Sequence, residues 1–316
     1  MAKNVKNIGI DLGNSTICVA GMGADGNIIN AYTYSVYSND TALMSGDIIE
    51  CRGTKIVLGV GQSTLTNVDK TNREYIEHQI LWAVNAVYGA GTHYINLGTG
   101  LPISIYKAKK DEFAQKLRGL GTIEGVVNGK EISVNIVDVK VMAEGYAAIK
   151  PLSPYIDKDS TTLIIDIGLK TTDVLLIEWD GKFKIVNYGT VNIALYDMYK
   201  VLQEKIAAEG VEVTIEQIDR KFNSGKPIIR TEKGDFNLEE HLVDTIGVCR
   251  DIMKDIENKF GKTVLHDKVF VGGGSKKLIK AIGDRMKNNI KLPMELTWYC
   301  NCIGYLINQL NVKHLI

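Results

Sequence analysis

Short apolar runs separated by polar or turn-forming residues predict a mixture of strands and helices along the chain. Residues 5–20 predict a β-hairpin, and strand-like runs follow at residues 27–36 and 47–60. Residues 72–88 carry apolar side chains at helical spacing, so they predict a helix that ends before Gly89. The chain therefore begins as an α/β domain.

The alternation of strands and helices continues through the rest of the first half. Residues 94–97 predict a strand, and residues 107–118 predict a charged helix. Asn128-Gly129 lies between two alternating runs, which is a strong signal for a hairpin turn. A helix rich in small residues is expected at about 141–150, and the proline-containing stretch 151–160 is the most linker-like part of the chain.

The second half repeats the plan of the first. Residues 163–177 predict another hairpin, a strand is expected at 182–188, and a short buried strand at 268–271 precedes a run of glycines. Helices are expected at residues 192–208, 214–222, 238–260 and 296–310.

Two related halves predict two domains, which the length of 316 residues allows. We expect domain I at residues 1–158, with an insertion at about 30–75. Domain II is expected at residues 159–316, with an insertion at about 192–262. The C-terminal helix, at about 296–310, could return to domain I.

One motif occurs once in each half. In residues 8–16 and again in residues 164–173, an apolar strand ends in Asp-x-Gly, a polar turn follows and an apolar strand resumes. Glycine lets backbone N–H groups approach phosphate oxygens, and an aspartate at a strand end can hold a hydrated divalent cation. A single Asp-x-Gly turn is most often only a hairpin. The repeat predicts that Asp11 and Asp166 grip one polyphosphate from two sides.

Two further segments could carry chemistry. Gly272-Gly273-Gly274-Ser275 follows a buried strand and opens a helix, so its bare backbone and free N–H groups could contact a nucleoside or phosphate. The alternative is a strand-to-helix turn without a ligand. Glu144 lies among Ala and Gly residues, where its carboxylate could orient a water for attack on a γ-phosphate. The alternative there is a solvated residue on a helix face.

Composition mainly excludes classes of function. Lys+Arg and Asp+Glu both number 37, so the zero net charge argues against a large basic surface and against direct nucleic-acid binding. No apolar run is long enough to span a membrane, and residues 1–7 lack a signal-peptide segment, so we expect a cytoplasmic protein without membrane attachment. The five cysteines fit no zinc spacing, and Cys300 and Cys302 are expected to be core residues rather than a metal pair.

The order of these motifs resembles that of the actin-like ATPase superfamily. The shared features are a phosphate hairpin, a small-residue helix carrying a glutamate, a second phosphate hairpin, a glycine-rich adenosine loop and a second small-residue helix, here with Cys302 and Gly304. The stretch Thr99-Gly-Leu-Pro-Ile-Ser104 is similar to one common in the bacterial plasmid-segregating, ParM-like actins. The resemblance covers residues 8 to about 304 and implies an actin-like two-domain α/β fold, with two related sheet-and-helix halves around a nucleotide cleft.

The resemblance also implies roles for particular residues. Asp11 and Asp166 would bind Mg²⁺ through waters, and Glu144 would position the attacking water. The loops of the two hairpins would cradle the phosphates through Gly13, Asn14, Ser15, Thr16, Gly168, Lys170 and Thr171. The nucleoside would contact Gly272, Gly273, Gly274 and Ser275. The expected cofactors are Mg²⁺ and ATP, with GTP as an alternative.

Two positions depart from the pattern of the superfamily. Many relatives have a lysine where this chain has Cys18, which cannot supply a positive charge. Many also have a small residue where this chain has Leu169. Lys170 could compensate for the first departure, because a flexible ammonium group can reach a phosphate as a point charge. The alternative is that Lys170 is a solvated turn residue.

The resemblance implies an ATPase that assembles head to tail, since an interface of that kind that does not close gives an open helical filament. It also implies a DNA-binding adaptor that connects the filament to plasmid DNA. One alternative is a monomeric sugar or acetate kinase, with Asp173 or Asp138 as its base. A chaperone-type nucleotide switch would need a substrate domain, which we do not identify. A phage or chromosomal actin-like protein is also compatible.

Overall fold

The computed structural model describes residues 4–40, 46–63, 70–282 and 287–310. The chain divides into two compact units, which we describe separately. Unit 1 comprises Met1–Pro154 and Tyr299–Ile316, and unit 2 comprises Tyr155–Trp298. The units therefore divide four residues before the predicted boundary, and the C-terminal segment belongs with the N-terminal unit.

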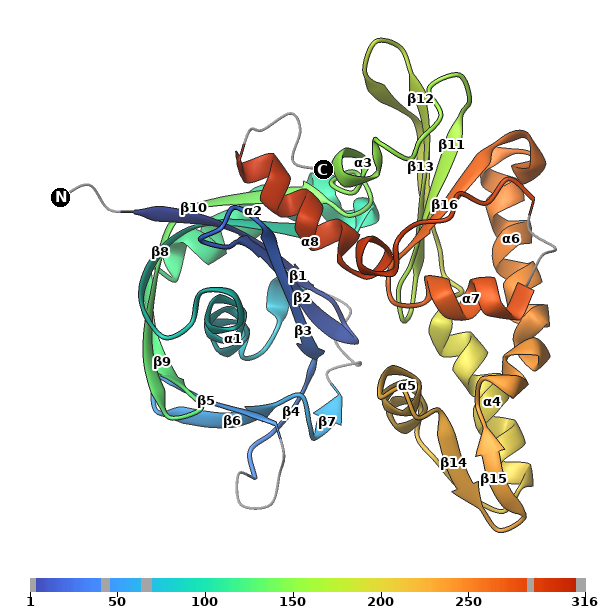
Figure 1. Ribbon diagram of the computed structural model, residues 1–316, viewed down its shortest axis with the longest axis horizontal. Coiled ribbons are helices and arrows are strands. Elements are labelled where there is room, and N and C mark those ends of the chain that lie inside the picture. Colours follow the sequence, from blue (N-terminus) through green and yellow to red (C-terminus); the bar gives the residue numbers. More distant parts are fainter. Residues whose placement is uncertain (1–3, 41–45, 64–69, 283–286, 311–316) are drawn as a thin grey trace. The chain divides into compact units, whose positions relative to one another are not determined.

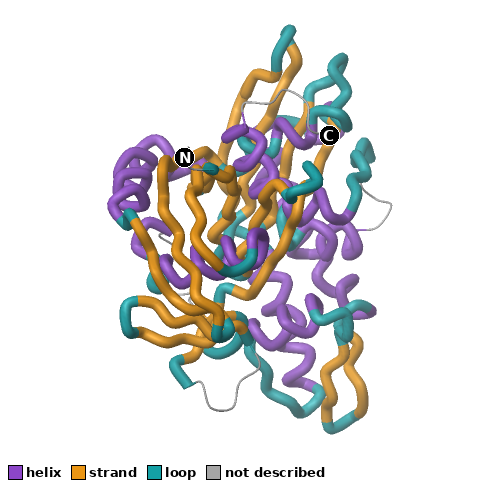
Figure 2. The backbone as a smooth tube through the Cα atoms, turned by 60° about the vertical axis from the view of Figure 1, so that its left-hand side comes forward, coloured by secondary structure: helices purple, strands orange, loops and turns teal. Residues whose placement is uncertain are grey.

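Unit 1 contains a ten-stranded sheet with the order β3-β2-β1-β8-β10-β9-β5-β6-β4-β7. Its strands, orange in Figure 2, are β1 (Val5–Leu12), β2 (Thr16–Met22), β3 (Ile28–Tyr34), β4 (Val36–Ser38), β5 (Asp47–Cys51), β6 (Thr54–Leu58), β7 (Gln62–Ser63), β8 (Gly91–Leu101), β9 (Thr122–Val127) and β10 (Lys130–Ala143). Strands β1, β8 and β10 are parallel, and β2 returns antiparallel to β1. Asn128 and Gly129 have φ angles of 50° and 79°, as the predicted two-residue hairpin turn requires.

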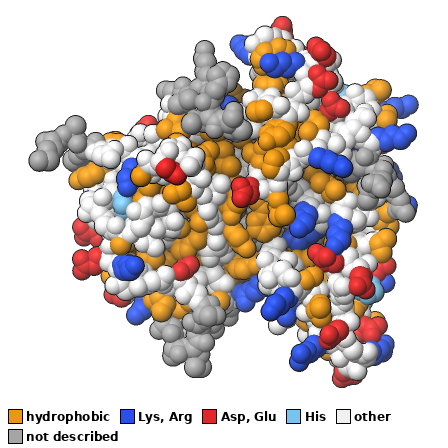
Figure 3. Space-filling model, in the orientation of Figure 1, with side chains coloured by type: hydrophobic (Ala, Val, Ile, Leu, Met, Phe, Trp, Pro, Cys, Tyr) orange, Lys and Arg blue, Asp and Glu red, His pale blue; other side chains and the backbone are white. Residues whose placement is uncertain are grey.

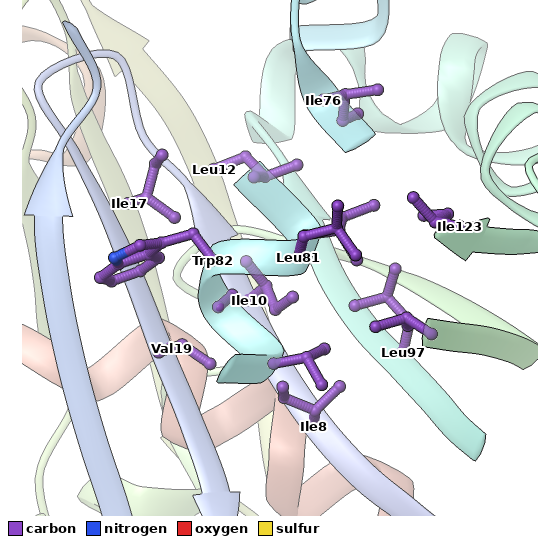
Figure 4. Close-up of a cluster of buried hydrophobic side chains, with 14 of the residues drawn as sticks. Ile8, Ile10, Leu12, Ile17, Val19, Ile76, Leu81, Trp82, Leu97 and Ile123 are labelled. Atoms are coloured by element: carbon purple, nitrogen blue, oxygen red, sulfur yellow. The ribbon is translucent and has the colours of Figure 1, made fainter. Parts of the chain in front are cut away.

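The sheet of unit 1 curves around one helix. That helix is α1 (Ile76–Tyr88), and the unit also contains the 3₁₀ helix η1 (Lys70–Asn72), α2 (Ile103–Gly119), α3 (Ile149–Leu152) and the part of α8 (Met294–Leu310) from Tyr299 onward. Side chains of α1 such as Leu81 and Trp82 pack against Ile10 and Ile17 of the first two strands (Figure 4). Burying one such side chain stabilises the fold by about 1.5–3 kcal/mol, so this core fixes β1 and β2 in place.

Helix α8 lies against the strands and turns of unit 1 at unusually short range. A Cβ at Gly9 of β1 would overlap the carbonyl group of Cys302, and a Cβ at Gly304 would overlap the backbone of Ala147. All five cysteines are buried, and none of them forms a disulfide. Cys300 and Cys302 are therefore small core residues of this contact, and the described residues contain no cluster of three metal-ligating side chains.

Unit 2 contains a four-stranded sheet with the order β13-β12-β11-β16 (Figure 1). Its strands are β11 (Thr162–Ile167), β12 (Thr172–Trp179), β13 (Phe183–Val191) and β16 (Asp267–Val271), and β14 (Ile228–Thr231) and β15 (Gly234–Asn237) form a separate hairpin. Its helical segments are α4 (Leu195–Ala208), α5 (Ile215–Asn223), η2 (Glu240–Thr245), α6 (Ile246–Phe260), η3 (Thr263–Leu265) and α7 (Ser275–Ile282). Strand β11 pairs antiparallel with β12 and parallel with β16.

The start of each sheet has the same plan. In unit 1, an antiparallel meander of three strands is followed across the sheet by the parallel strand β8; in unit 2, three antiparallel strands are followed by the parallel strand β16. This mixed α/β architecture with two related halves is the fold class that the sequence predicts. Among the described residues, no helix combines the length and the apolar character needed to cross a membrane.

Two sequence predictions of local structure are wrong, and one hairpin was not predicted. The helix expected at about 141–150 is the end of β10, then a turn at residues 144–148, then the short helix α3. The alanines there favour a helix, but Gly145 does not, and pairing of β10 with β8 as far as Ala143 overrides the preference of the alanines. The helix expected at 238–260 starts as the 3₁₀ segment η2, and the β14–β15 hairpin was not predicted.

Candidate functional site

The two Asp-x-Gly segments form hairpins with the same register. In the first, Asp11 pairs with Cys18 and Leu12 pairs with Ile17 across β1 and β2. In the second, Asp166 pairs with Asp173 and Ile167 pairs with Thr172 across β11 and β12. Each aspartate is therefore the second-last residue of its strand, directly before the loop.

The loop of the first hairpin is tight and is held by the rest of unit 1. A Cβ at Gly13 would overlap the carbonyl oxygen of Thr16, so only glycine fits there without a shift of the loop. The backbone N–H of Ser35 donates to the carbonyl oxygen of Ser15, at 2.8 Å. The Arg73 guanidinium donates to the carbonyl oxygen of Gly13, at 2.9 Å, and to the side-chain oxygen of Asn14, at 3.1 Å.

Lys70 of η1 brings a positive charge to the carboxylates of unit 1. Its Nζ atom forms an ion pair with Glu144 and lies 3.3 Å from Oδ1 of Asp11. The Lys70 side chain is only 6% exposed. Burial by itself lowers the pKa of this ammonium group, but the charges of Glu144 and Asp11 outweigh burial, so the pKa is raised above its usual range. Lys70 therefore stays protonated and joins the two carboxylates.

Glu144 is fixed by the turn that follows β10. Its backbone N–H donates to the carbonyl oxygen of Leu101, at 2.9 Å. The next residue, Gly145, has a φ angle of 74°, which favours glycine, and its N–H donates to Oδ1 of Asn301 in α8, at 3.2 Å. The side chain of Glu144 is only 11% exposed. Neither the predicted helix nor the solvated-face alternative therefore describes this residue.

The second hairpin is held by the start of α4. The backbone N–H groups of Leu195 and Tyr196 donate to the carbonyl oxygens of Gly168, at 3.4 Å, and Leu169, at 2.7 Å. Leu169 is buried, so this departure from the superfamily pattern contributes to the core. The Gly168 N–H donates to Thr171, at 3.0 Å, which closes the loop that carries the half-buried Lys170.

The glycine-rich loop packs directly on the second hairpin. Gly272 has a φ angle of 85°, and a Cβ there would overlap the Asp166 carboxylate. The N–H of Gly272 donates to the carbonyl oxygen of Thr297 and that of Gly274 to Ile167, both at 3.0 Å. Ser275 is buried and its hydroxyl donates to the Gly272 carbonyl oxygen, at 2.8 Å. By contrast, a Cβ at Gly273 would meet no atom within 4 Å.

The four residues predicted to bind the nucleoside therefore differ in whether the rest of the chain already fills the space beside them. Packing of the chain against itself explains why Gly272 and Gly274 are glycines, and the Ser275 hydroxyl is used within the turn. Gly273 is the position where the missing side chain leaves open space beside the backbone. A flat ligand could approach the backbone there.

The carboxylates suit a hydrated cation held together with phosphates. Mg²⁺ usually keeps several waters and binds one or two carboxylates plus substrate phosphates, rather than an all-protein cage. Asp11 and Asp166 each present a carboxylate at a strand end of its own unit, which is the donor type that Mg²⁺ bound with a nucleotide uses.

Within each unit, the structure brings predicted residues together. In unit 1, Lys70 and Arg73 connect the residues Asp11, Gly13, Asn14 and Glu144. In unit 2, Gly272 packs beside Asp166, next to the hairpin loop. The expectation that the two hairpins grip one nucleotide concerns the placement of one unit relative to the other, and it stays a prediction.

The sequence pattern did not predict roles for Lys70 and Arg73. The only local signal is a pair of basic residues at i and i+3, directly before an apolar helix that is buried almost throughout. A basic residue before a helix usually has no special role, so this signal could not identify the partners of Lys70.

Each half of the chain matches a family model of actin-like proteins. Residues 9–146 match the family model for the N-terminal domain of actin-like proteins, and residues 164–284 match the model for the C-terminal domain of archaeal MreB-like actin homologues. No curated protein matches the sequence.

Solved structures of actin homologues are similar over nearly the whole chain. An archaeal actin homologue in complex with ADP is 20% identical, with a TM-score of 0.74, over 98% of this chain and 100% of that chain. A 15-stranded ParM filament from Clostridium botulinum is 17% identical, with a TM-score of 0.72, over 98% and 100% of the chains. ParM from Bacillus thuringiensis with ATP is 16% identical, with a TM-score of 0.68, over 98% and 99%.

At these identities the solved structures establish the fold, and the two family models add that each half matches an actin-homologue domain. The paired hairpins lie inside the two matched regions, at Asp11 and at Asp166. The chain therefore belongs to the actin-like ATPase superfamily, with ParM and archaeal actin homologues among its structural relatives.

Proposed function

We propose that this protein is an ATPase that forms filaments when it binds a nucleotide. The observation that carries the proposal is the pair of hairpins with the same register, each with an aspartate before a glycine-opened loop. Complexes of similar proteins with ADP and with ATP support a nucleotide as the ligand. GTP is the alternative nucleotide.

The residues of the chain divide the chemistry between them. The loops at Gly13 and Gly168 cradle the phosphates with backbone groups, and the Gly273 backbone lies against the nucleoside. Asp11 and Asp166 would hold Mg²⁺, and the ion would supply neutralisation of the charge that develops on the phosphates. Glu144 orients the attacking water and accepts its proton, because its carboxylate is held by a rigid turn beside Asp11 and Lys70.

Assembly is proposed as head-to-tail contact between identical chains. The C. botulinum relative is described as a filament, which supports self-association of this protein. A DNA-binding adaptor would connect such a filament to plasmid DNA. Indirect attachment fits the charge distribution, since positive and negative side chains are interspersed on the face drawn in Figure 3 and the net charge is zero.

Neither of the two aspartates that we considered as the base of a monomeric kinase suits that role. Asp173 accepts a hydrogen bond from the Thr190 hydroxyl, at 2.5 Å, and is only 4% exposed. Asp138 pairs with Arg118, at 3.2 Å, on the exposed side of β10. Asp138 lies outside the residues that we assign to the nucleotide. Asp173 lies opposite Asp166, but it is buried and hydrogen-bonded to Thr190.

Light scattering of the purified protein tests the proposal. Addition of Mg-ATP or Mg-GTP should raise scattering above a critical protein concentration, and EDTA should abolish the rise. A matched sample with nucleotide but without Mg²⁺ separates assembly from aggregation. A protein that stays monomeric at tens of micromolar, and that releases ADP only when a sugar or acetate is present, would support the kinase instead.

A further inference from the structure

The first hairpin supplies no cation of its own near Asp11. Cys18 lies opposite Asp11 and is only 6% exposed. The lysine in these two strands, Lys6, lies near the start of β1, where its Nζ is 3.3 Å from Nδ1 of His93. A triphosphate bound beside Asp11 and Glu144 would therefore meet two carboxylates, unless another segment brings a positive charge.

The segment from Lys70 to Arg73 brings two such charges. The Lys70 ammonium group contacts both Asp11 and Glu144, and the Arg73 guanidinium contacts the backbone of the loop at Gly13. The two positive charges of Lys70 and Arg73 balance the two negative charges of Asp11 and Glu144. At a few ångströms, an uncompensated carboxylate would repel a phosphate, because the partly buried site screens charge less well than bulk water.

This segment is held in position by further hydrogen bonds. Arg73 also donates to the hydroxyl of Ser35, at 3.1 Å, and to the side-chain oxygen of Gln79, at 3.4 Å. Lys116 of α2 donates to the carbonyl oxygen of Thr71, at 2.5 Å. A lysine on a fixed backbone loses less conformational freedom when it contacts a ligand than a lysine on a free loop.

Resting on the proposed function, we propose that Lys70 is a positioning residue with two tasks. It supplies to the bound triphosphate the positive charge that position 18 lacks, and it orients the Glu144 carboxylate toward the attacking water. Both tasks follow from one ammonium group that already joins Asp11 and Glu144. The sequence suggested that Lys170, in unit 2, replaces the lysine missing at position 18. Lys70, in unit 1, is the candidate that the structure offers instead.

A purely structural ion pair would behave differently from a phosphate-directed lysine. Loss of a buried pair destabilises the fold whether or not a nucleotide is bound. A phosphate-directed lysine also changes the preference for triphosphate over diphosphate, because only the triphosphate carries the γ-phosphate. The ratio of the ATP and ADP affinities is therefore the readout that a structural role alone would not change.

The test compares Lys70→Met and Lys70→Arg with the parent protein and with Lys130→Met, a control at the exposed start of β10. Affinities for ATP and ADP are measured by calorimetry, with Mg²⁺ and with EDTA, and the melting temperature of each protein is recorded without nucleotide. Lys70→Met should weaken ATP binding by roughly 10- to 100-fold and ADP binding by only a few-fold. Lys70→Arg should regain most of the preference for ATP, and Lys130→Met should match the parent.

If Lys70→Met does not fold, Glu144→Gln is compared with the double variant Lys70→Met/Glu144→Gln, in which one carboxylate is removed together with the cation. Loss of the preference for ATP in the double variant alone would support the inference. An unchanged ratio of ATP to ADP affinity, in a protein whose parent binds both nucleotides, would overturn the role of Lys70 and leave the proposed function intact. A parent that binds neither nucleotide would overturn both.

Discussion

Asp11 in the first hairpin lies opposite Cys18, and its carboxylate contacts the ammonium group of Lys70, which comes from a different part of unit 1. Asp166 in the second hairpin lies opposite Asp173, and the glycine-rich loop packs against it at Gly272. The strand register and the loop opening are the same in both hairpins. What differs is the neighbouring segment that each unit brings to the aspartate.

This comparison shows that a local backbone motif does not determine its own electrostatics. In unit 1 the neighbour is a buried lysine that also holds Glu144. In unit 2 the neighbour is bare backbone, which lets a ligand approach but adds no side-chain charge at Gly272 or Gly273. We therefore expect the first hairpin to carry most of the hydrolytic chemistry and the second to contribute mainly to binding.

The largest expected effect is on hydrolysis, from Glu144→Gln. The amide keeps the size of the side chain but cannot accept a proton, so the rate of phosphate release should fall by roughly 10²–10⁴-fold while nucleotide binding stays nearly intact. Filaments of this variant should persist longer after assembly. Glu178→Gln, on the exposed end of β12, is the control. Unchanged phosphate release would return Glu144 to a role in packing only.

The next largest effect is expected on Mg-nucleotide affinity, from substitution of either aspartate. Asp11→Ala and Asp166→Ala should each weaken Mg-nucleotide binding by about 10- to 100-fold, because each removes a charged ligand-binding group. Both should also reduce the gain in affinity that Mg²⁺ gives over EDTA, measured by calorimetry. If one variant binds like the parent, only one hairpin contributes to the cation, and the symmetry of the two halves is one of fold alone.

A smaller effect separates the glycines of unit 2. Gly272→Ala should destabilise the protein by about 1–2 kcal/mol, since a side chain at this positive φ angle is strained and would also overlap Asp166. Gly273→Ala meets open space, so its stability should stay within about 0.5 kcal/mol of the parent. Urea denaturation measures both variants. Only Gly273→Ala can then report on the nucleoside without loss of stability, and equal destabilisation of the two would contradict this assignment.

The smallest effect is expected from Lys170→Ala. If Lys170 contacts the phosphates, ATP binding should weaken more than ADP binding. Because Lys70 already places a fixed ammonium group beside Asp11 and Glu144, we expect a loss of at most about threefold in ATP affinity, as for an exposed ion pair. A loss as large as that of Lys70→Met would show that the second hairpin shares the role of the missing lysine.

The sequence was most informative where local chemistry restricts the backbone. Asn128-Gly129 predicts its hairpin turn because few other residues adopt the required φ angles. The paired Asp-x-Gly hairpins and the strand before Gly272 are also local patterns, and each forms at the predicted place. Glu144 shows the limit, since its small neighbours favour a helix, yet pairing of β10 with β8 extends the strand to Ala143 and leaves Glu144 in a turn.

The alternation of strands and helices, the repeat of the hairpins and the candidate aspartates can be predicted from the sequence, because they depend on residues close together in the chain. Which charges meet those aspartates, and why particular glycines are required, depends on how the chain folds. Lys70 reaches Asp11 and Glu144 through folding of distant segments, and Gly9 and Gly304 are needed because α8 packs closely on unit 1. Such contacts depend on which segments become neighbours in space, and no single local pattern carries that information.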